Sequence, residues 1–379
     1  MSNAVIVGYV RSPFTSANKG ELARVRPDDL AAQVVRGLLD RTRVDPEAIE
    51  DLILGCAFPE GEQGFNVARL VGMIAGLPHS VAGTTVNRWC GSSMQAVHVA
   101  AGAIALGSGH AFIAAGVESM TRVPMMGFNP MPNPALAEKE PGAYMAMGIT
   151  AENLAAQYGI SRAEQEACAA GSHRKAAAAQ SAGKLADEIV TIETPDGRRV
   201  TEDGCIRPET TTEKLATLKP AFDEKGSVTA GTSSPLTDGA SACLVTSEDY
   251  AKANGLKIMA RIKSSAVVGC APEIMGIGPV AATERALKRA GLTIKDIDII
   301  ELNEAFSSQA IACMRDLKID LDKTNIDGGA IALGHPLGAT GARITGKAAA
   351  LLKRESKQFA LATQCIGGGQ GIATILEAA

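Results

Sequence analysis

Apolar and polar positions along the chain follow two alternating periods, one typical of strands and one typical of helices. The apolar run from Val5 to Val10 predicts a first strand. A helix is predicted from Pro27, because Pro and two acids stand in its first turn and a helically spaced apolar stripe follows. Strands are predicted at Asp51–Cys56 and Ala82–Asn87, and a buried helix followed by a strand between Ala96 and Val117.

The same order of elements returns near the C-terminus. A helix is predicted at Ala281–Ala290, and strands are predicted at Ile297–Leu302 and Phe359–Thr363. When the sequence is aligned with itself at an offset of about 250 residues, these patterns coincide, and Gly91 aligns with Gly338. We therefore expect two halves of one α/β fold, near 1–118 and 262–379, with 237–261 completing the first. Strand–helix alternation predicts parallel sheets covered by helices.

The middle of the chain, residues 119–236, has a different composition. Residues 120–147 hold six of the twelve Met and five Pro. Pro breaks regular structure, and clustered Met side chains suit an adaptable apolar wall. We expect an inserted loop domain that carries part of a ligand site.

Composition excludes several classes of protein. The chain has 379 residues, 46% of them apolar, and a net charge of −4, which fits a globular protein and argues against general nucleic-acid binding. The uncharged stretch between Ala96 and Val117 is broken by Gly107–Gly109, so no membrane span is expected. No apolar signal region opens the chain, which favours a cytoplasmic location. The eight cysteines form no CxxC pair, which excludes the usual metal-ligand spacings.

One cysteine stands where a nucleophile would be placed. Cys90 follows a predicted strand and precedes a predicted helix, with Gly91 after it. Backbone N–H groups at a helix start favour a thiolate, so we expect an exposed thiol with a pKa below its usual value of about 8.5. An inert core cysteine is the alternative that this motif alone leaves open.

Two Gly-rich loops carry the other candidate groups. His335 lies between Gly334 and Pro336 and is a candidate general base, with a core histidine as the alternative. Cys365 follows the strand at Phe359–Thr363 and precedes a run of glycines.

Together these motifs resemble those of the thiolases. Residues 87–93 resemble the family's nucleophile motif, and 334–336 resemble its histidine motif. Residues 365–369 resemble its second-cysteine motif, and Asn303-Glu304-Ala305-Phe306 resembles a fourth motif. The resemblance covers essentially the whole chain. Within the family the chain resembles most the bacterial 3-ketoacyl-CoA thiolases of fatty acid oxidation, through segments 207–211, 229–234 and 275–279.

The resemblance implies a fold and a reaction. The fold would be the thiolase fold, with two duplicated βαβαβ-type halves, helix-covered mixed sheets and an inserted loop domain. The enzyme would be an acyltransferase that cleaves 3-ketoacyl-CoA with CoA. Cys90, activated by His335, would be the nucleophile, and Cys365 would be the acid and base.

Further residues would stabilise developing negative charge or hold the substrate. His335 and a water on Asn303 would form one oxyanion hole, and the N–H groups of Cys90 and Gly367 the other, with Glu304 as an orienting group beside the site. CoA would lie on the insertion. Its expected contacts are Arg207 near the nucleotide, Ser234 near the pantetheine, and Met147, Met275 and Phe306 along the acyl and pantetheine wall.

CoA would act as a cosubstrate, with no permanently bound cofactor and no metal. A homodimer or homotetramer is expected, and a hydratase/dehydrogenase subunit is a candidate partner. One alternative is an acetyl-CoA acetyltransferase specific for acetoacetyl-CoA, although such enzymes usually carry His where this chain has Ala146. A 3-ketoacyl synthase would normally have His in place of Cys365. A non-catalytic lipid carrier of the same fold is the third alternative.

Overall fold

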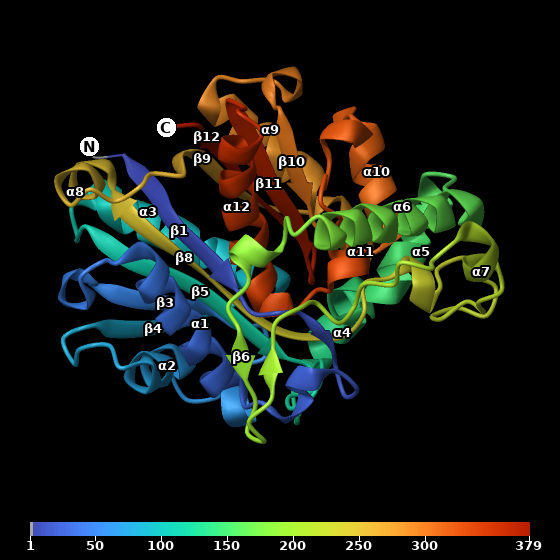
Figure 1. The fold of residues 1–379 in the computed structure, drawn as a ribbon. Coiled ribbons are helices and arrows are strands. Elements are labelled where there is room, and N and C mark those ends of the chain that lie inside the picture. Colours follow the sequence, from blue (N-terminus) through green and yellow to red (C-terminus); the bar gives the residue numbers. More distant parts are fainter. Residues whose placement is uncertain (1–2) are drawn as a thin grey trace.

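The computed structural model describes residues 3–379, in which twelve strands and twelve α-helices alternate. Ten of the strands form one sheet, in the order β10-β11-β12-β9-β1-β8-β5-β3-β4 with β2 beside β8 (Figure 1). These strands are β1 (Ala4–Arg11), β2 (Thr15–Ser16), β3 (Asp51–Gly55), β4 (Ala82–Val86), β5 (Ala111–Ser119), β8 (Thr237–Ser247), β9 (Ala260–Gly269), β10 (Ile299–Leu302), β11 (Phe359–Ile366) and β12 (Gln370–Glu377).

The other two strands, β6 (Ile192–Glu193) and β7 (Arg199–Val200), form a separate hairpin. The helices are α1 (Pro27–Thr42), α2 (Val67–Ala75), α3 (Ser92–Leu106), α4 (Pro134–Lys139), α5 (Met147–Gln157), α6 (Arg162–Ser181), α7 (Thr212–Ala216), α8 (Glu248–Ala253), α9 (Gly278–Ala290), α10 (Ser307–Leu317), α11 (Ala330–Leu333) and α12 (Leu337–Arg354). No helix within residues 3–379 is both long enough and apolar enough to cross a membrane.

The large sheet is mixed, as the resemblance to the thiolases implied, whereas the parallel pairing expected from strand–helix alternation was wrong for most of it. Parallel pairing joins β3 to β4, β3 to β5, and β10 to β11. The pairs β5–β8, β8–β1, β1–β9, β9–β12 and β12–β11 are antiparallel. The tight turn between β11 and β12 shows the reason, because a short turn can join only antiparallel neighbours.

Two sets of strands have the same order outward from the β1–β9 contact. The first set runs β1-β8-β5-β3 and the second runs β9-β12-β11-β10, and the directions of pairing agree at each step. A helix precedes the corresponding strands in each set, α1 before β3 and α9 before β10. This repeated order is the arrangement that the offset comparison predicted. The boundaries at 118, 236 and 262 stay a prediction.

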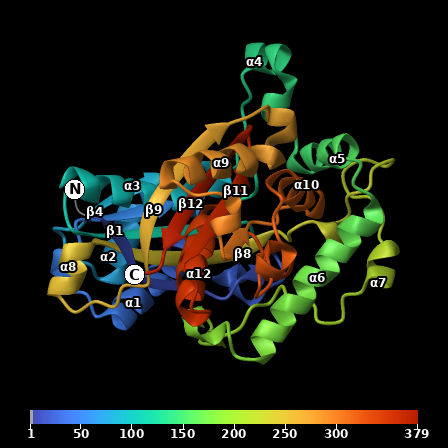
Figure 2. The ribbon, with the colours of Figure 1, turned by 90° about the horizontal axis from the view of Figure 1, so that it is seen from above.

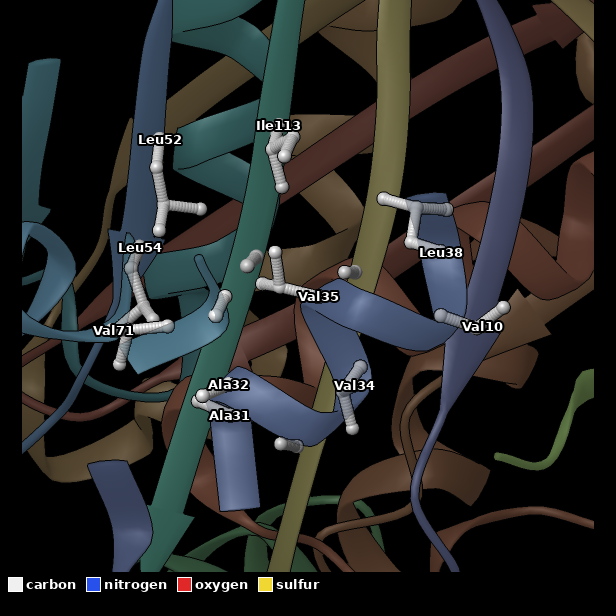
Figure 3. Packing of buried hydrophobic residues seen from close by; sticks show 14 of the residues in the cluster. Val10, Ala31, Ala32, Val34, Val35, Leu38, Leu52, Leu54, Val71 and Ile113 are labelled. Atoms are coloured by element: carbon white, nitrogen blue, oxygen red, sulfur yellow. The ribbon is translucent and has the colours of Figure 1, made fainter. Parts of the chain in front are cut away.

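Helices form layers on both sides of these strands. Apolar residues of α1 and α2 pack on the first set of strands, where Val35 and Leu38 share one core cluster with Val10 and Ile113 (Figure 3). The helix α9 packs on the second set. Apolar residues of α3 and α12 contact strands of both sets, so these two helices lie between them (Figure 1).

The helices α3 and α12 approach each other unusually closely near their first turns. A Cβ on Gly341 would lie 2.2 Å from the backbone nitrogen of Met94, so only glycine fits there. The N–H of Ala342 donates to the Ser93 hydroxyl at 2.8 Å. Nearly every residue of α12 up to Leu352 is buried, as expected for a helix packed on all sides.

The middle of the chain forms the helices α4 to α7 and irregular segments beside the sheet. Figure 1 shows α5, α6 and α7 on the side of α10 and α11, and Figure 2 shows α4 standing away from the sheet. The region predicted as an inserted loop domain therefore contains four helices as well as irregular segments.

Buried charges attach the middle region to the strand β1 and the helix α12. Arg11 of β1 is fully buried and donates to both carboxylate oxygens of Asp203, at 2.6 and 2.7 Å, and to Glu188 at 2.9 Å. Glu188 also pairs with Lys347 of α12, which contacts Asp327. Every charge in this chain of ion pairs therefore has a partner of opposite sign, as burial requires.

Replacing Arg11 with Met tests how much this network of ion pairs contributes to the stability of the fold. The change leaves the Asp203 carboxylate buried without its ion-pair partner and removes one of the two cations that Glu188 contacts, so we expect the free energy of unfolding to fall by about 3–5 kcal/mol. Urea-induced unfolding followed by circular dichroism measures it. Arg198→Met is the matched control, because the Arg198–Asp196 pair is exposed and should contribute less than about 1 kcal/mol. Equal losses in both variants would contradict this account.

Candidate active site

Three loops and the last residues of strand β11 carry the predicted chemical groups. Cys90 lies in the turn Trp89–Gly91 before α3, and His335 lies between α11 and α12. Asn303 directly follows β10, and Cys365 lies near the end of β11. Because α3 and α12 touch at their first turns, the residues that precede them lie on the same side of the molecule.

The turn that carries Cys90 is held by its own side chains. Trp89 has a φ of 44°, which is rare for an aromatic residue and marks local strain. Its N–H donates to the Asn87 side chain at 2.8 Å, and the N–H of Arg88 donates to the Ser92 hydroxyl at 2.9 Å. The side-chain amide of Gln364 donates to the Cys90 carbonyl. These contacts fix the backbone around the sulfur.

Burial determines the protonation of the Cys90 thiol. The residue is 9% exposed, and burial raises its pKa to about 11. The N–H groups of Gly367 and of Cys90 itself face the thiol and lower its pKa, but by less than burial raises it. The expectation of an exposed thiol with a lowered pKa was therefore wrong, because desolvation outweighs the backbone donors.

Cys365 shares this environment. It is fully buried, and burial raises its pKa well above the usual value. The next largest cause is the charge of Cys90, so the two thiols lie close enough for the ionisation of one to oppose ionisation of the other. Only one of the two thiols is expected to carry a negative charge at a time.

A glycine turn lies against the nucleophile loop. A Cβ on Gly367 would come within 2.6 Å of the Trp89 ring and 3.4 Å of the Met147 sulfur. Gly368 and Gly369 have φ values of 72° and 82°, which glycine adopts without strain. The turn can therefore present the Gly367 N–H to Cys90, and side chains at these positions would prevent it.

His335 is oriented by two threonines. The backbone N–H of His335 donates to the Thr237 hydroxyl at 3.0 Å, and the ring atom Nδ1 lies 2.6 Å from the Thr340 hydroxyl oxygen. Thr340 donates its only hydroxyl proton to the Pro336 carbonyl at 3.1 Å, so it accepts the proton of Nδ1. This hydrogen-bond pattern assigns the free electron pair to Nε2.

The other face of the imidazole meets Asn303. Nε2 of His335 lies 3.4 Å from Nδ2 of Asn303, which can donate to it. Burial, and then the charge of Arg343, lower the pKa of His335 to about 3. The ring is therefore neutral, and its Nε2 can accept a proton. The Oδ1 atom of Asn303 is buried, and no group within residues 3–379 pairs with it.

The carboxylate of Glu304 is held by residues of α6, of α11 and of the segment between β10 and α11. It accepts hydrogen bonds from Ser172 at 2.6 Å, Asn325 at 2.8 Å and the N–H of Ile331 at 3.3 Å. These contacts tie the turn after β10 to α6 and α11. Glu304 therefore holds the backbone beside Asn303 in place.

The predicted apolar wall forms beside Cys365. Met147, Met275 and Phe306 belong to the same cluster as Cys365, together with Ala151, Val228 and Ala305. The ring of Phe306 meets Phe222 edge to face at 5.8 Å between centroids.

The two predicted CoA contacts lie in different surroundings. The N–H of Ser234 donates to the Ala305 carbonyl at 2.9 Å, which places Ser234 next to the apolar wall. Arg207 is exposed, and its N–H donates to Nδ1 of His173 at 3.1 Å. The guanidinium of Arg207 contacts none of the other predicted site residues within the described part of the chain.

The residues that hold His335 and Cys90 in position were not among those predicted from the sequence. Thr340 and Thr237 orient His335, and Gln364 holds the Cys90 carbonyl. A further one is Glu118, whose buried carboxylate accepts from the N–H groups of Ala57 and Gly338 at 2.8 and 2.9 Å. Thr340 lies five residues after His335 in the first turns of a helix, a spacing that could have indicated a contact.

Glu118 and Cys365 have corresponding places in the repeated order of elements, since β5, which ends with Glu118 and Ser119, follows α3, and β11, which ends with Cys365 and Ile366, follows α12. Within residues 3–379 no group of three or more His, Cys, Asp and Glu side chains is arranged to hold a metal ion.

Comparison with known proteins assigns this arrangement to a family. The family model described as thiolase, N-terminal domain matches residues 4–249, and that described as thiolase, C-terminal domain matches 256–378. The chain is 50% identical to the 3-ketoacyl-CoA thiolase of Bacillus subtilis and 51% identical to that of Erwinia tasmaniensis, over 100% of both chains in each comparison. The 3-ketoacyl-CoA thiolase of Photobacterium profundum is 50% identical over the same share. With matches to both halves and to full-length relatives, the chain belongs to the thiolase family.

Proposed function

We propose that this protein is a 3-ketoacyl-CoA thiolase, an acetyl-CoA C-acyltransferase of fatty acid β-oxidation. It would cleave 3-ketoacyl-CoA with CoA to acetyl-CoA and a shortened acyl-CoA. The observation that carries this proposal is the convergence of two buried thiols and a histidine: Gln364, next to Cys365, bonds to the Cys90 carbonyl, and Asn303 contacts both the backbone of β11 and the His335 ring. Full-length identity of 50% to proteins named 3-ketoacyl-CoA thiolase supports it.

In the first step Cys90 would attack the 3-keto carbonyl while Nε2 of His335 takes its proton. The bond between C2 and C3 of the substrate then breaks, and its electron pair stays on C2 of the departing acetyl-CoA. Cys365 would protonate that carbon and become a thiolate. The acyl group remains on Cys90 as a thioester. The raised pKa of Cys365 supports this role, because the residue holds its proton until a strong base forms.

In the second step CoA would restore the enzyme. The Cys365 thiolate takes the proton of the CoA thiol, and the CoA sulfur attacks the acyl carbonyl. The Cys90 sulfur leaves and recovers its proton from His335. Because both acyl groups are thioesters, this exchange needs no large input of free energy, and a covalent intermediate divides the reaction into two accessible steps.

Two sets of donors would stabilise the oxyanions. The N–H groups of Cys90 and Gly367 face the Cys90 sulfur, so they can reach an oxygen on the acylated carbon. His335, once protonated, and a water on Asn303 would serve the thioester oxygen of the departing acetyl-CoA. The unpaired Oδ1 of Asn303 supports this assignment, since a buried amide oxygen needs a partner. Glu304 would act as a positioning residue.

Substrate contacts follow from the apolar wall. We assign the pantetheine and acyl chain to the side of Met147, Met275 and Phe306, and Ser234 to the pantetheine. Arg207 would meet the nucleotide, and its exposure fits a contact with a solvated phosphate. CoA acts as a cosubstrate in this proposal, and thiol, imidazole and amide groups supply all of the chemistry without a permanently bound cofactor.

A homodimer or homotetramer is the proposed assembly. The strand β4 forms an edge of the sheet, and exposed apolar side chains lie near it, with Phe65 96% and Met73 48% exposed. An unpaired edge beside apolar surface suits pairing with a second copy. A hydratase/dehydrogenase partner subunit and a cytoplasmic location stay predictions.

Thiolysis of a series of substrates from acetoacetyl-CoA to 3-ketohexadecanoyl-CoA tests the function. We expect turnover that increases beyond acetoacetyl-CoA, because the wall beside Cys365 is apolar and Ala146 leaves space before Met147. Activity confined to acetoacetyl-CoA would favour the acetyl-CoA acetyltransferase instead. Cys90→Ser is the control and should lose at least about 10³-fold in kcat. Unchanged turnover in that variant would contradict the role of Cys90, and no turnover of any substrate by the unmodified protein would favour a non-catalytic lipid carrier.

Replacing Cys365 with Ser separates the two steps. The serine hydroxyl cannot readily take the proton of CoA, so steady-state thiolysis should fall by at least about 10²-fold. Octanoyl-CoA should still acylate Cys90 slowly, which intact mass analysis would detect as one octanoyl adduct. The Cys90→Ser protein should carry no adduct. An adduct on Cys90→Ser, or none on Cys365→Ser, would contradict the assigned roles.

A further inference from the structure

A cavity of about 710 Å³ lies apart from the two thiols, between α6, α10 and residues 318–324. Its floor includes Ser172 and Glu304, whereas Cys90, Cys365 and His335 do not line it. The volume falls in the range of small-molecule sites, about 300–1,000 Å³. Nothing in the proposed reaction uses this α6–α10 cavity.

The walls of the α6–α10 cavity suit an alkyl chain. Ala167, Ile311, Met314, Ile319 and Leu321 contribute apolar surface. None of the residues that line it is aromatic, so the cavity offers no ring on which a nucleobase could stack. Met314 and the two isoleucines are flexible or branched aliphatic groups, which adapt to a chain of methylene units.

Cations gather at the rim of the cavity. Arg174 and Lys318 are exposed, and neither side chain forms a hydrogen bond or ion pair within residues 3–379. Lys175 donates to the carbonyls of Leu321 and Thr324 at 3.1 and 2.8 Å and keeps its charge without a carboxylate partner.

The acids at the rim do not cancel this charge. Glu164 is paired with Arg315, which leaves Asp322 as the one free carboxylate at the rim among the described residues. Among the described residues, the lining therefore holds three cations without a carboxylate partner, Arg174, Lys175 and Lys318, and two carboxylates without a cationic partner, Asp322 and the hydrogen-bonded Glu304. This excess of positive charge favours an anionic head group. Arg174 can meet a carboxylate with two parallel N–H groups.

We propose that the α6–α10 cavity binds the anion of a fatty acid. The alkyl chain lies along Ile311 and Met314, and the carboxylate is held by Arg174 and Lys318. Ser172, at the floor, donates to Glu304 and accepts from the N–H of Gly329 at 3.1 Å. The site therefore adjoins the turn that holds Asn303, although the binding itself does not depend on the proposed reaction.

Calorimetric titration of the full-length protein with sodium dodecanoate tests this site, with saturating CoA present to occupy the candidate active site. We expect saturable binding of one dodecanoate per chain. The double variant Arg174→Gln/Lys318→Gln should bind at least about tenfold more weakly, because both changes remove a partner of the carboxylate. Lys184→Gln/Lys288→Gln, which removes two exposed charges elsewhere, should bind as the unmodified protein does.

Two further measurements identify the class of ligand and the position of its binding site on the protein. Dodecanol, which has the same chain without the charge, should bind more weakly than dodecanoate. Methyl resonances of Ile311, Ile319 and Met314 should shift on titration, and those of Met147 and Met275 should not. Three results would overturn the proposal: no saturable binding with CoA present, equal affinity in the two double variants, or shifts confined to Met147 and Met275. Tighter binding of adenosine 3′,5′-bisphosphate than of dodecanoate would also overturn it, in favour of a nucleotide site.

Discussion

The contact between the first turns of α3 and α12 is the constraint on which the rest of the structure depends. Gly341 removes the side chain that would strike the backbone of Met94, and Ser93 bonds to the backbone of α12. Each helix follows a loop that carries a reactive group, so close contact of the helices brings the two loops together. The contact also places both loops inside the molecule, between the two sets of strands.

Burial then sets the electrostatics of the site. It raises the pKa of Cys90 to about 11 and lowers that of His335 to about 3, so the resting groups are neutral. Charge arises only when a substrate reacts, and the N–H groups of Cys90 and Gly367 are already aimed at the place where it develops. Fixed donors in a buried site stabilise such charge more than donors in solution would, because they need no rearrangement. The buried ion pairs of Arg11 and Lys347 lie in a different part of the molecule, where they hold the middle region to the fold.

Much of the fold and of the candidate active site could be predicted from the sequence, and the features that could not be predicted have physical reasons. Local signals predicted α1 from Pro27 and the strand at 51–56, and the offset comparison predicted the repeated order of strands. The four motifs predicted which loops meet. Apart from the local pair β11–β12, the antiparallel pairs depend on contacts between residues far apart in the chain, such as β5 with β8, which no local pattern contains. The same holds for the burial of Cys90. Thr340 and Gln364 were missed because their importance lies in where their side chains point.

The pH dependence of Cys90 alkylation tests most directly the claim that burial keeps the resting site neutral. Iodoacetamide reacts with the thiolate, so the rate follows the ionised fraction of the thiol. Peptide mass analysis of the Cys90 segment separates it from the other seven of the eight cysteines. With a pKa of about 11, the rate constant should keep rising about tenfold per pH unit through pH 9. A plateau below about pH 8 would show a thiolate already formed in the resting protein and would contradict the account.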